Sequence, residues 1–135
     1  MKAHRFVFIL LSAGLAAAGC TGMSGRVPPI DDAMRKAAAE LFAPIRKLTG
    51  DMEALFGTAM QAKRSGDDAG YRTALKEAVA LCYDVQDRWN EVIALMPANE
   101  AFDEEETAMH HFPMDAAVVD RAITALKNME RRLHN

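Results

Sequence analysis

The segment MHHFPM holds the densest set of metal-binding side chains in the chain, with two imidazoles and two thioethers at Met109, His110, His111 and Met114. Imidazole nitrogen and thioether sulfur suit copper, so this segment is the candidate metal site. Its spacing argues against a shared ion. Adjacent histidines on a helix diverge by about 100°, and Pro113 disturbs the turn that would bring Met114 beneath His110. The alternative interpretation is a polar connection that packs its apolar residues against the fold.

The two cysteines of the chain, Cys20 and Cys82, have different surroundings. Cys82 lies on an apolar helical stripe with Trp89 one heptad later, and a buried thiol of this kind is usually inert. With one cysteine in the domain there is no Cys-x-x-Cys-His site for c-type haem, and no long stripe carries a histidine for haem held without covalent bonds. The acidic run at 103–106 lacks the spacing of a calcium loop and is typical of a solvated face. No phosphate loop, serine elbow or zinc signature occurs, so the sequence predicts no enzyme.

Residues 1–19 have the three parts of an export signal. Lys2, His4 and Arg5 make a basic start, and the thirteen residues from Phe6 to Ala18 carry no charge. As a helix, thirteen residues cover about 20 Å, which is well short of the roughly 30 Å hydrocarbon core of a bilayer. The sequence therefore predicts a signal peptide that is removed.

Residues 17–20, AAGC, resemble the lipobox of bacterial lipoproteins. The resemblance implies that the Cys20 thiol is joined to diacylglycerol and that the chain is then cut before it. Two or three acyl chains would make release from a membrane negligible. Thr21 stands where inner-membrane lipoproteins usually carry Asp, which implies the periplasmic face of the outer membrane. The alternative is cleavage by ordinary signal peptidase, which leaves a soluble periplasmic or secreted protein that begins at Gly19.

Loss of the signal would leave 116 residues, enough for one compact domain. Lys2 and Arg5 leave with the signal, so 14 basic residues remain against all 19 acidic ones and the net charge is −5. Nucleic acid needs a concentrated positive surface, so it is excluded as a partner. With Cys20 lipidated, Cys82 has no partner within the chain, and no disulfide holds the fold.

The region after the signal divides into a tether and a helical domain. Two glycines and two prolines within residues 20–30 discourage regular structure, so this stretch is expected to be a flexible tether that carries the lipidated Cys20. From residue 31 to residue 135, apolar residues recur at alternating intervals of four and three, which places them on one stripe of a helix. No alternating strand pattern appears in the sequence.

Three stripes predict three long helices, at about 31–64, 67–96 and 114–134. Pro44 is expected to kink or split the first helix near residues 40–44. Residues 99–112 leave open a choice between a short helix and a loop. We therefore predict an all-α fold, an antiparallel bundle of three long helices. The stripes consist of Met34, Ala38, Leu41, Ile45, Leu48, Met52, Leu55 and Ala59; Tyr71, Leu75, Ala78, Cys82, Val85, Trp89, Val92 and Met96; and Val119, Ala122, Leu126, Met129 and Leu133.

These observations favour a non-enzymatic envelope lipoprotein whose bundle contacts a protein partner at the membrane. The alternative is a periplasmic small-ligand or copper-binding bundle that uses residues 109–114. Phe42, Phe56 and Leu81 lie off the main stripes. One exposed patch of these three residues would support a partner site, whereas their burial would mean only a thicker bundle.

Overall fold

The computed structural model describes residues 26–135, which form four helices and no strand. The helices are α2 (Asp32–Arg64), α3 (Asp68–Leu95), α4 (Glu104–His111) and α5 (Pro113–His134). The all-helical class is therefore confirmed, and the open choice at residues 99–112 is settled in favour of a short helix, α4. The predicted signal peptide, Cys20 and the first part of the tether lie outside the described residues.

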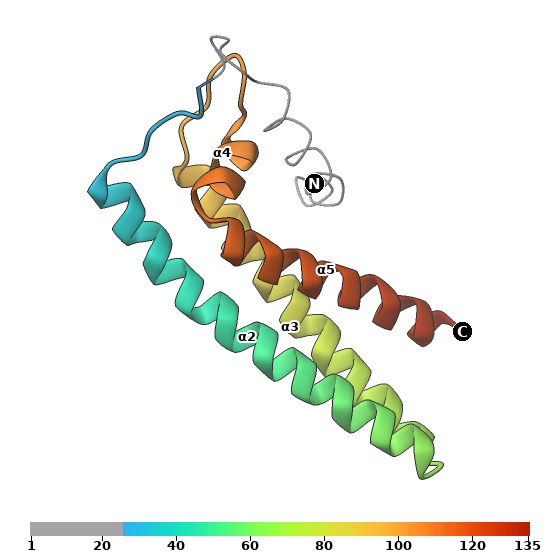
Figure 1. Ribbon diagram of the computed structural model, residues 1–135. Helices are drawn as coiled ribbons and strands as arrows, with labels where there is room; N and C mark the ends of the chain where they lie inside the picture. The colour runs from blue at the N-terminus through green and yellow to red at the C-terminus, as the bar shows by residue number, and fades with distance from the viewer. Residues whose placement is uncertain (1–25) are drawn as a thin grey trace.

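The first long helix, α2, begins and ends where local chemistry requires. Asp31 is its N-cap, and the carboxylate accepts a hydrogen bond from the Met34 amide at 2.7 Å. The chain leaves the helix through Ser65 and Gly66, and Gly66 has φ = +79°, a conformation that favours glycine. Of the two outcomes expected at Pro44, a kink or a split, the split does not occur, because α2 continues through Pro44 as one helix (Figure 1). Residues on both sides of the proline are buried against the other helices, and this packing outweighs the one lost backbone hydrogen bond.

Helix α3 returns beside α2 in the opposite direction, so the two form a long hairpin (Figure 1). Asp67 caps its start by accepting a hydrogen bond from the Gly70 amide at 2.9 Å. The helix ends at Leu95, two residues before Pro97. The turn at residues 65–67, hereafter the tip, lies at the far end of the molecule from α4.

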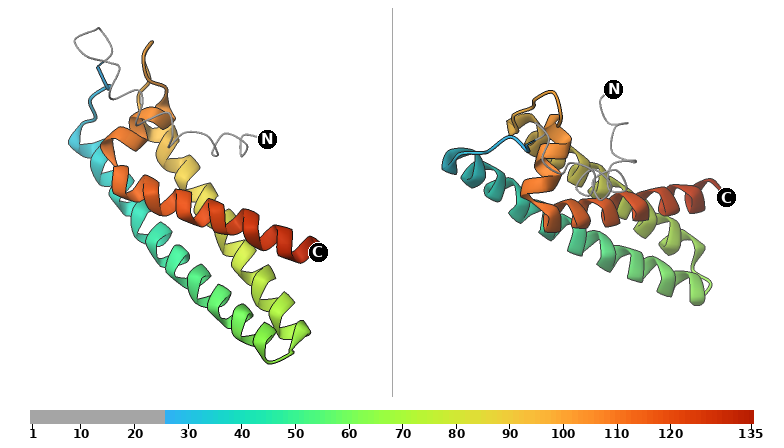
Figure 2. Two further views of the ribbon diagram at one scale, coloured as in Figure 1. Left: turned by 45° about the vertical axis from the view of Figure 1, so that its right-hand side comes forward. Right: turned by 45° about the horizontal axis from the view of Figure 1, so that its top comes forward.

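Helices α4 and α5 follow at the other end of the hairpin. Asp103 and Glu106 form a capping box at the start of α4, and Pro113 occupies the first turn of α5. Phe112 separates the two helices. Its ring packs against that of Phe42, with 4.9 Å between the ring centroids. Figures 1 and 2 show that α5 crosses the hairpin obliquely and that the tip projects past its end.

The predicted stripes are found largely in the core. All eight residues of the second stripe, which ends at the C-cap Met96 of α3, are buried except Tyr71, which is half-buried, and four of the five on α5 are buried. On α2 the buried residues follow a stripe that is displaced from the predicted one. Ala38, Ile45, Met52 and Ala59 are buried as predicted, but the other four predicted positions are only half-buried, and the off-stripe residues Phe42 and Thr49 are buried instead. The displacement arises because α2 contacts α5 as well as α3.

The end of the predicted tether lies against the fold. Pro28 is buried, and its carbonyl oxygen is 2.7 Å from Nε2 of His111. The side-chain amide of Asn99 donates a hydrogen bond to the Arg26 carbonyl at 2.9 Å, and Ile30 packs against the core. Residues 26–30 therefore form a strap along the α4 end, and the chain enters the fold there.

Candidate functional site

The structure does not gather the four residues of the candidate copper segment into one environment. Met109 on α4 is buried, whereas Met114 in the first turn of α5 is 79% exposed. The His110 ring packs edge-on against Phe102 with 5.0 Å between ring centroids, while His111 contacts the Pro28 carbonyl. Within residues 26–135, no three side chains of the His, Cys, Asp and Glu types form a group that could hold a metal ion. The observed contacts match the packing interpretation of this segment.

Cys82 lies in the core, as its stripe predicts. It has no exposed surface, and its thiol donates a hydrogen bond to the Ala122 carbonyl at 3.5 Å. Burial, together with the negative charge of Glu130, raises the pKa of the Cys82 thiol to about 12. The thiolate is the reactive form of cysteine, so this environment makes Cys82 chemically inert at neutral pH.

The three off-stripe apolar residues do not form an exposed patch. Phe42 is 1% exposed and packs against Trp89 and Phe112. Phe56 and Leu81 are half-buried against the core, and Phe56 also has the Arg132 guanidinium 5.8 Å from its ring centroid. By the criterion stated above, these residues thicken the bundle and do not mark a partner site.

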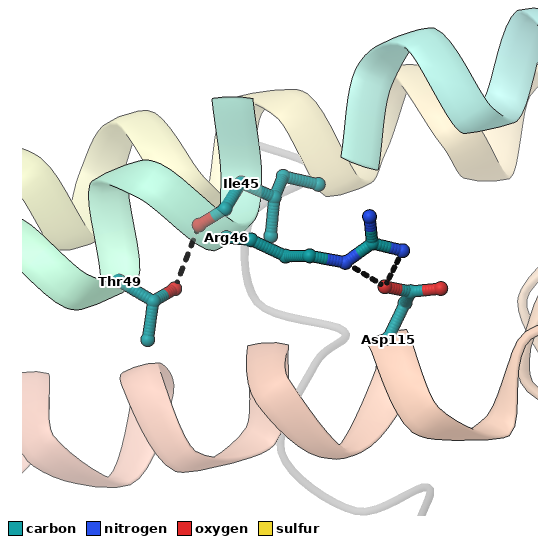
Figure 3. A network of polar contacts seen from close by, with 4 residues as sticks. All are labelled: Ile45, Arg46, Thr49 and Asp115. Atoms are coloured by element: carbon teal, nitrogen blue, oxygen red, sulfur yellow. Dashed lines mark hydrogen bonds and ion pairs between the residues drawn. The ribbon is translucent and has the colours of Figure 1, made fainter. Parts of the chain in front are cut away.

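Polar contacts fix α5 against both helices of the hairpin. Asp115 is nearly buried in the first turn of α5, and one carboxylate oxygen accepts hydrogen bonds from Nε and Nη2 of Arg46 at 2.9 and 2.7 Å (Figure 3). Figure 3 also shows the neighbouring Thr49 hydroxyl, which donates to the Ile45 carbonyl within α2 and is thereby satisfied in the core. On α3, the Tyr83 hydroxyl donates to Glu130 of α5 at 2.8 Å.

The two ends of the molecule carry opposite charge. The α4 end is acidic, whereas exposed basic residues collect toward the tip, on the last turns of α2 and α5 and the first turn and a half of α3. The acidic end includes Asp31, Asp32, Glu100, Asp103, Glu104 and Glu106 against the basic residues Arg26, Arg35 and Lys36, and the basic end includes Lys63, Arg64, Arg72, Arg131 and Arg132 against the acidic residues Asp67 and Asp68. The sequence analysis did not identify this separation. Basic residues in the last turns of α2 and α5 were a visible signal, but only the fold shows that these turns lie together.

Two open crevices lie on the surface of the described residues. The larger, of about 690 Å³, follows the groove between α2 and α3, and no α5 residue lines it. Its lining mixes Leu48 with charged residues that partly pair with each other, as in Lys47–Asp51 and Arg88–Glu91. The smaller, of about 420 Å³, lies between the tip and the end of α5, and we name it the tip crevice. Its lining consists of Lys63, Asp68, Tyr71, Arg72, Arg132 and Asn135.

Contacts between different helices position side chains of the tip crevice. The guanidinium of Arg72 donates a hydrogen bond to the Leu133 carbonyl at 3.0 Å, which holds the end of α5 near the start of α3. The Lys63 ammonium lies 5.2 Å from the centroid of the Tyr71 ring, at a favourable distance for a cation–π contact. Three helices therefore place three cationic side chains around one space.

Comparison with known proteins adds no relative. No family model, curated protein or solved structure matches the chain at a significant level. Among residues 26–135, no helix has the length and apolar character needed to cross a bilayer.

Proposed function

We propose that this chain is a non-enzymatic envelope lipoprotein, anchored through Cys20, whose three long helices act as one antiparallel bundle that serves as a protein-interaction or accessory module. The observation that carries this proposal is the strap. Residues 26–30 lie along the α4 end, so a lipid at Cys20 would attach the molecule by that end.

The lengths of the chain segments support this orientation. The six Cα–Cα steps from Cys20 to Arg26 can span at most about 22 Å, which would keep the α4 end close to the bilayer. The 33 residues of α2 extend about 50 Å as a helix, so the tip would lie well away from the lipid. The acidic α4 end would face the membrane surface, and the basic tip would face the opposite side, where a partner could reach it.

The chemistry of the core supports a role without catalysis. The one cysteine of the described residues is buried with a raised pKa, and both histidines of the 110–111 pair are engaged in packing or hydrogen bonding. The charged tip and the α2–α3 groove are surfaces suited to contact with other molecules.

Replacement of the lipidated sulfur tests the anchor. Cys20→Ser should move the protein from the membrane fraction to the soluble fraction, and mass spectrometry of the mature wild-type N-terminus should show Cys20 with fatty acyl chains. An unmodified N-terminus at Gly19, or unchanged fractionation of Cys20→Ser, would contradict the proposal. Cross-linking in intact cells, with the native anchor and with Cys20→Ser, then tests the accessory role, because a true envelope partner should be captured only when the anchor is present.

A further inference from the structure

The tip crevice concentrates positive charge in a chain that is acidic as a whole. Its lining includes three cationic side chains, those of Lys63, Arg72 and Arg132, and one carboxylate side chain, that of Asp68. No carboxylate of residues 26–135 forms an ion pair with any of the three cations. The three cations are exposed, and an excess of positive side chains around one space attracts anions from solution.

Each cation is held in place by a contact that leaves most of its hydrogen-bond donors available. The Arg132 guanidinium lies 5.8 Å from the centroid of the Phe56 ring, and the Lys63 ammonium lies 5.2 Å from that of Tyr71. Arg72 uses one of its five N–H groups on the Leu133 carbonyl. This preorganisation lowers the entropy cost of binding a ligand.

Two neighbouring carboxylates have hydrogen-bond partners of their own, and each keeps its negative charge. Asp67 accepts the hydrogen bond of the Gly70 amide as the N-cap of α3, and Glu130 accepts that of the Tyr83 hydroxyl. The C-terminal end of α2 lies beside the N-terminal end of α3 at the tip, and the C-terminal end of α5 lies near the start of α3, so the helix dipoles do not by themselves favour an anion. The side-chain cations of the lining are therefore the groups that would attract an anion to the crevice.

We propose that the tip crevice binds a phosphate group, held by Lys63, Arg72 and Arg132. Among the side chains that line the crevice, three cations stand against one carboxylate, Asp68, and this excess of positive side chains would attract a phosphate monoester. The guanidinium groups offer planar pairs of N–H donors that match phosphate oxygens, and Lys63 adds a compact charge. A space of about 420 Å³ also accommodates the small organic group that carries the phosphate. This inference does not depend on the lipid anchor.

A titration of the full chain in detergent, followed by NMR of backbone amide and arginine Nε–H signals, tests the proposal. Inorganic phosphate and glycerol 3-phosphate probe a free phosphate, and vesicles of phosphatidylcholine with phosphatidic acid probe a lipid phosphate. Chloride keeps the ionic strength constant, and acetate serves as the monovalent comparison. We expect saturable shifts confined to residues near the tip, with phosphate effective at lower concentration than acetate.

The variants separate a site from general attraction. Lys63→Gln should weaken phosphate binding about fivefold. The substitution removes one positive charge near a divalent anion, and solvent and salt partly screen the attraction that is lost. Arg132→Gln should weaken it about tenfold and Arg132→Lys less, because lysine keeps the charge without the planar donor pair. Lys36→Gln is the matched control. It removes an exposed lysine of the same helix about 40 Å from Lys63, and binding should not change.

Several results would overturn the proposal. They are the absence of saturable binding in both phosphate arms, equal potency of acetate and phosphate, or equal weakening by Lys63→Gln and Lys36→Gln. Lys63 is exposed and lies in the last turn of α2, so its replacement should leave the fold intact, and the unshifted core signals in the same spectra check this.

Discussion

The environment of Cys82 makes a quantitative prediction about thiol reactivity. With the pKa of this thiol at about 12 instead of the ordinary 9.0, the thiolate fraction at pH 8 is about 10⁻⁴ in the folded chain and about 10⁻¹ in the unfolded chain. Disulfide exchange requires the thiolate. Native Cys82 should therefore react with an aromatic disulfide reagent at least about a thousandfold more slowly than the urea-unfolded chain.

The assay uses the Cys20→Ser chain, so that Cys82 is the sole thiol, and follows release of the coloured thiol product at pH 8. Ala80→Cys in the same background is the control, because position 80 is exposed on the same helix and should label rapidly. If the labelling rate of native Cys82 is within about tenfold of the rate of the control thiol, Cys82 is not buried as the structure shows. A redox or nucleophilic role would then return to consideration.

The same raised pKa links stability to alkaline pH. Below pH 9 the thiol is protonated in both states and contributes no pH dependence. Above pH 9 the unfolded chain releases its proton and the folded chain keeps it until the pH approaches 12, so stability falls by about 1.4 kcal/mol per pH unit in that interval. Urea unfolding at pH 8 and pH 10 should show this loss in the parent, and Cys82→Ala should lack this contribution.

Two further perturbations test the turns and the helix contacts. Gly66→Ala should destabilise the fold by about 1 kcal/mol because φ is +79° there, whereas Gly50→Ala should stabilise it by about 0.5–1 kcal/mol because an added methyl group in α2 meets no atom within 4 Å. Urea midpoints that move in the same direction would contradict this assignment. A double-mutant cycle with Arg46→Gln and Asp115→Asn should give a coupling of about 1 kcal/mol, since the carboxylate is nearly buried but the arginine is largely exposed. The coupling should decrease in high salt, and a value near zero at low salt would mean that this ion pair does not hold α5 to α2.

Local sequence determined the helices of this protein. Asp31, Asp67 and Pro113 mark helix starts, Gly66 and Pro97 lie just beyond helix ends, and the alternation of four and three residues identified almost the whole buried face of α3. These signals work because capping, backbone conformation and apolar spacing act over a few residues. They also predicted that Cys82 lies in the core, where it is found.

Tertiary structure decided what depends on residues far apart in the chain. Pro44 remained inside α2 and Phe42 became buried because α2 packs against two helices, a fact that no single stripe contains. The strap forms because His111 and Asn99 contact the backbone carbonyls of Pro28 and Arg26. A sequence does not show which backbone carbonyl a side chain will contact. The tip crevice combines residues 63, 72 and 132, whose meeting depends on the oblique path of α5. The path of α5 depends on side-chain packing between helices, which local sequence patterns do not encode.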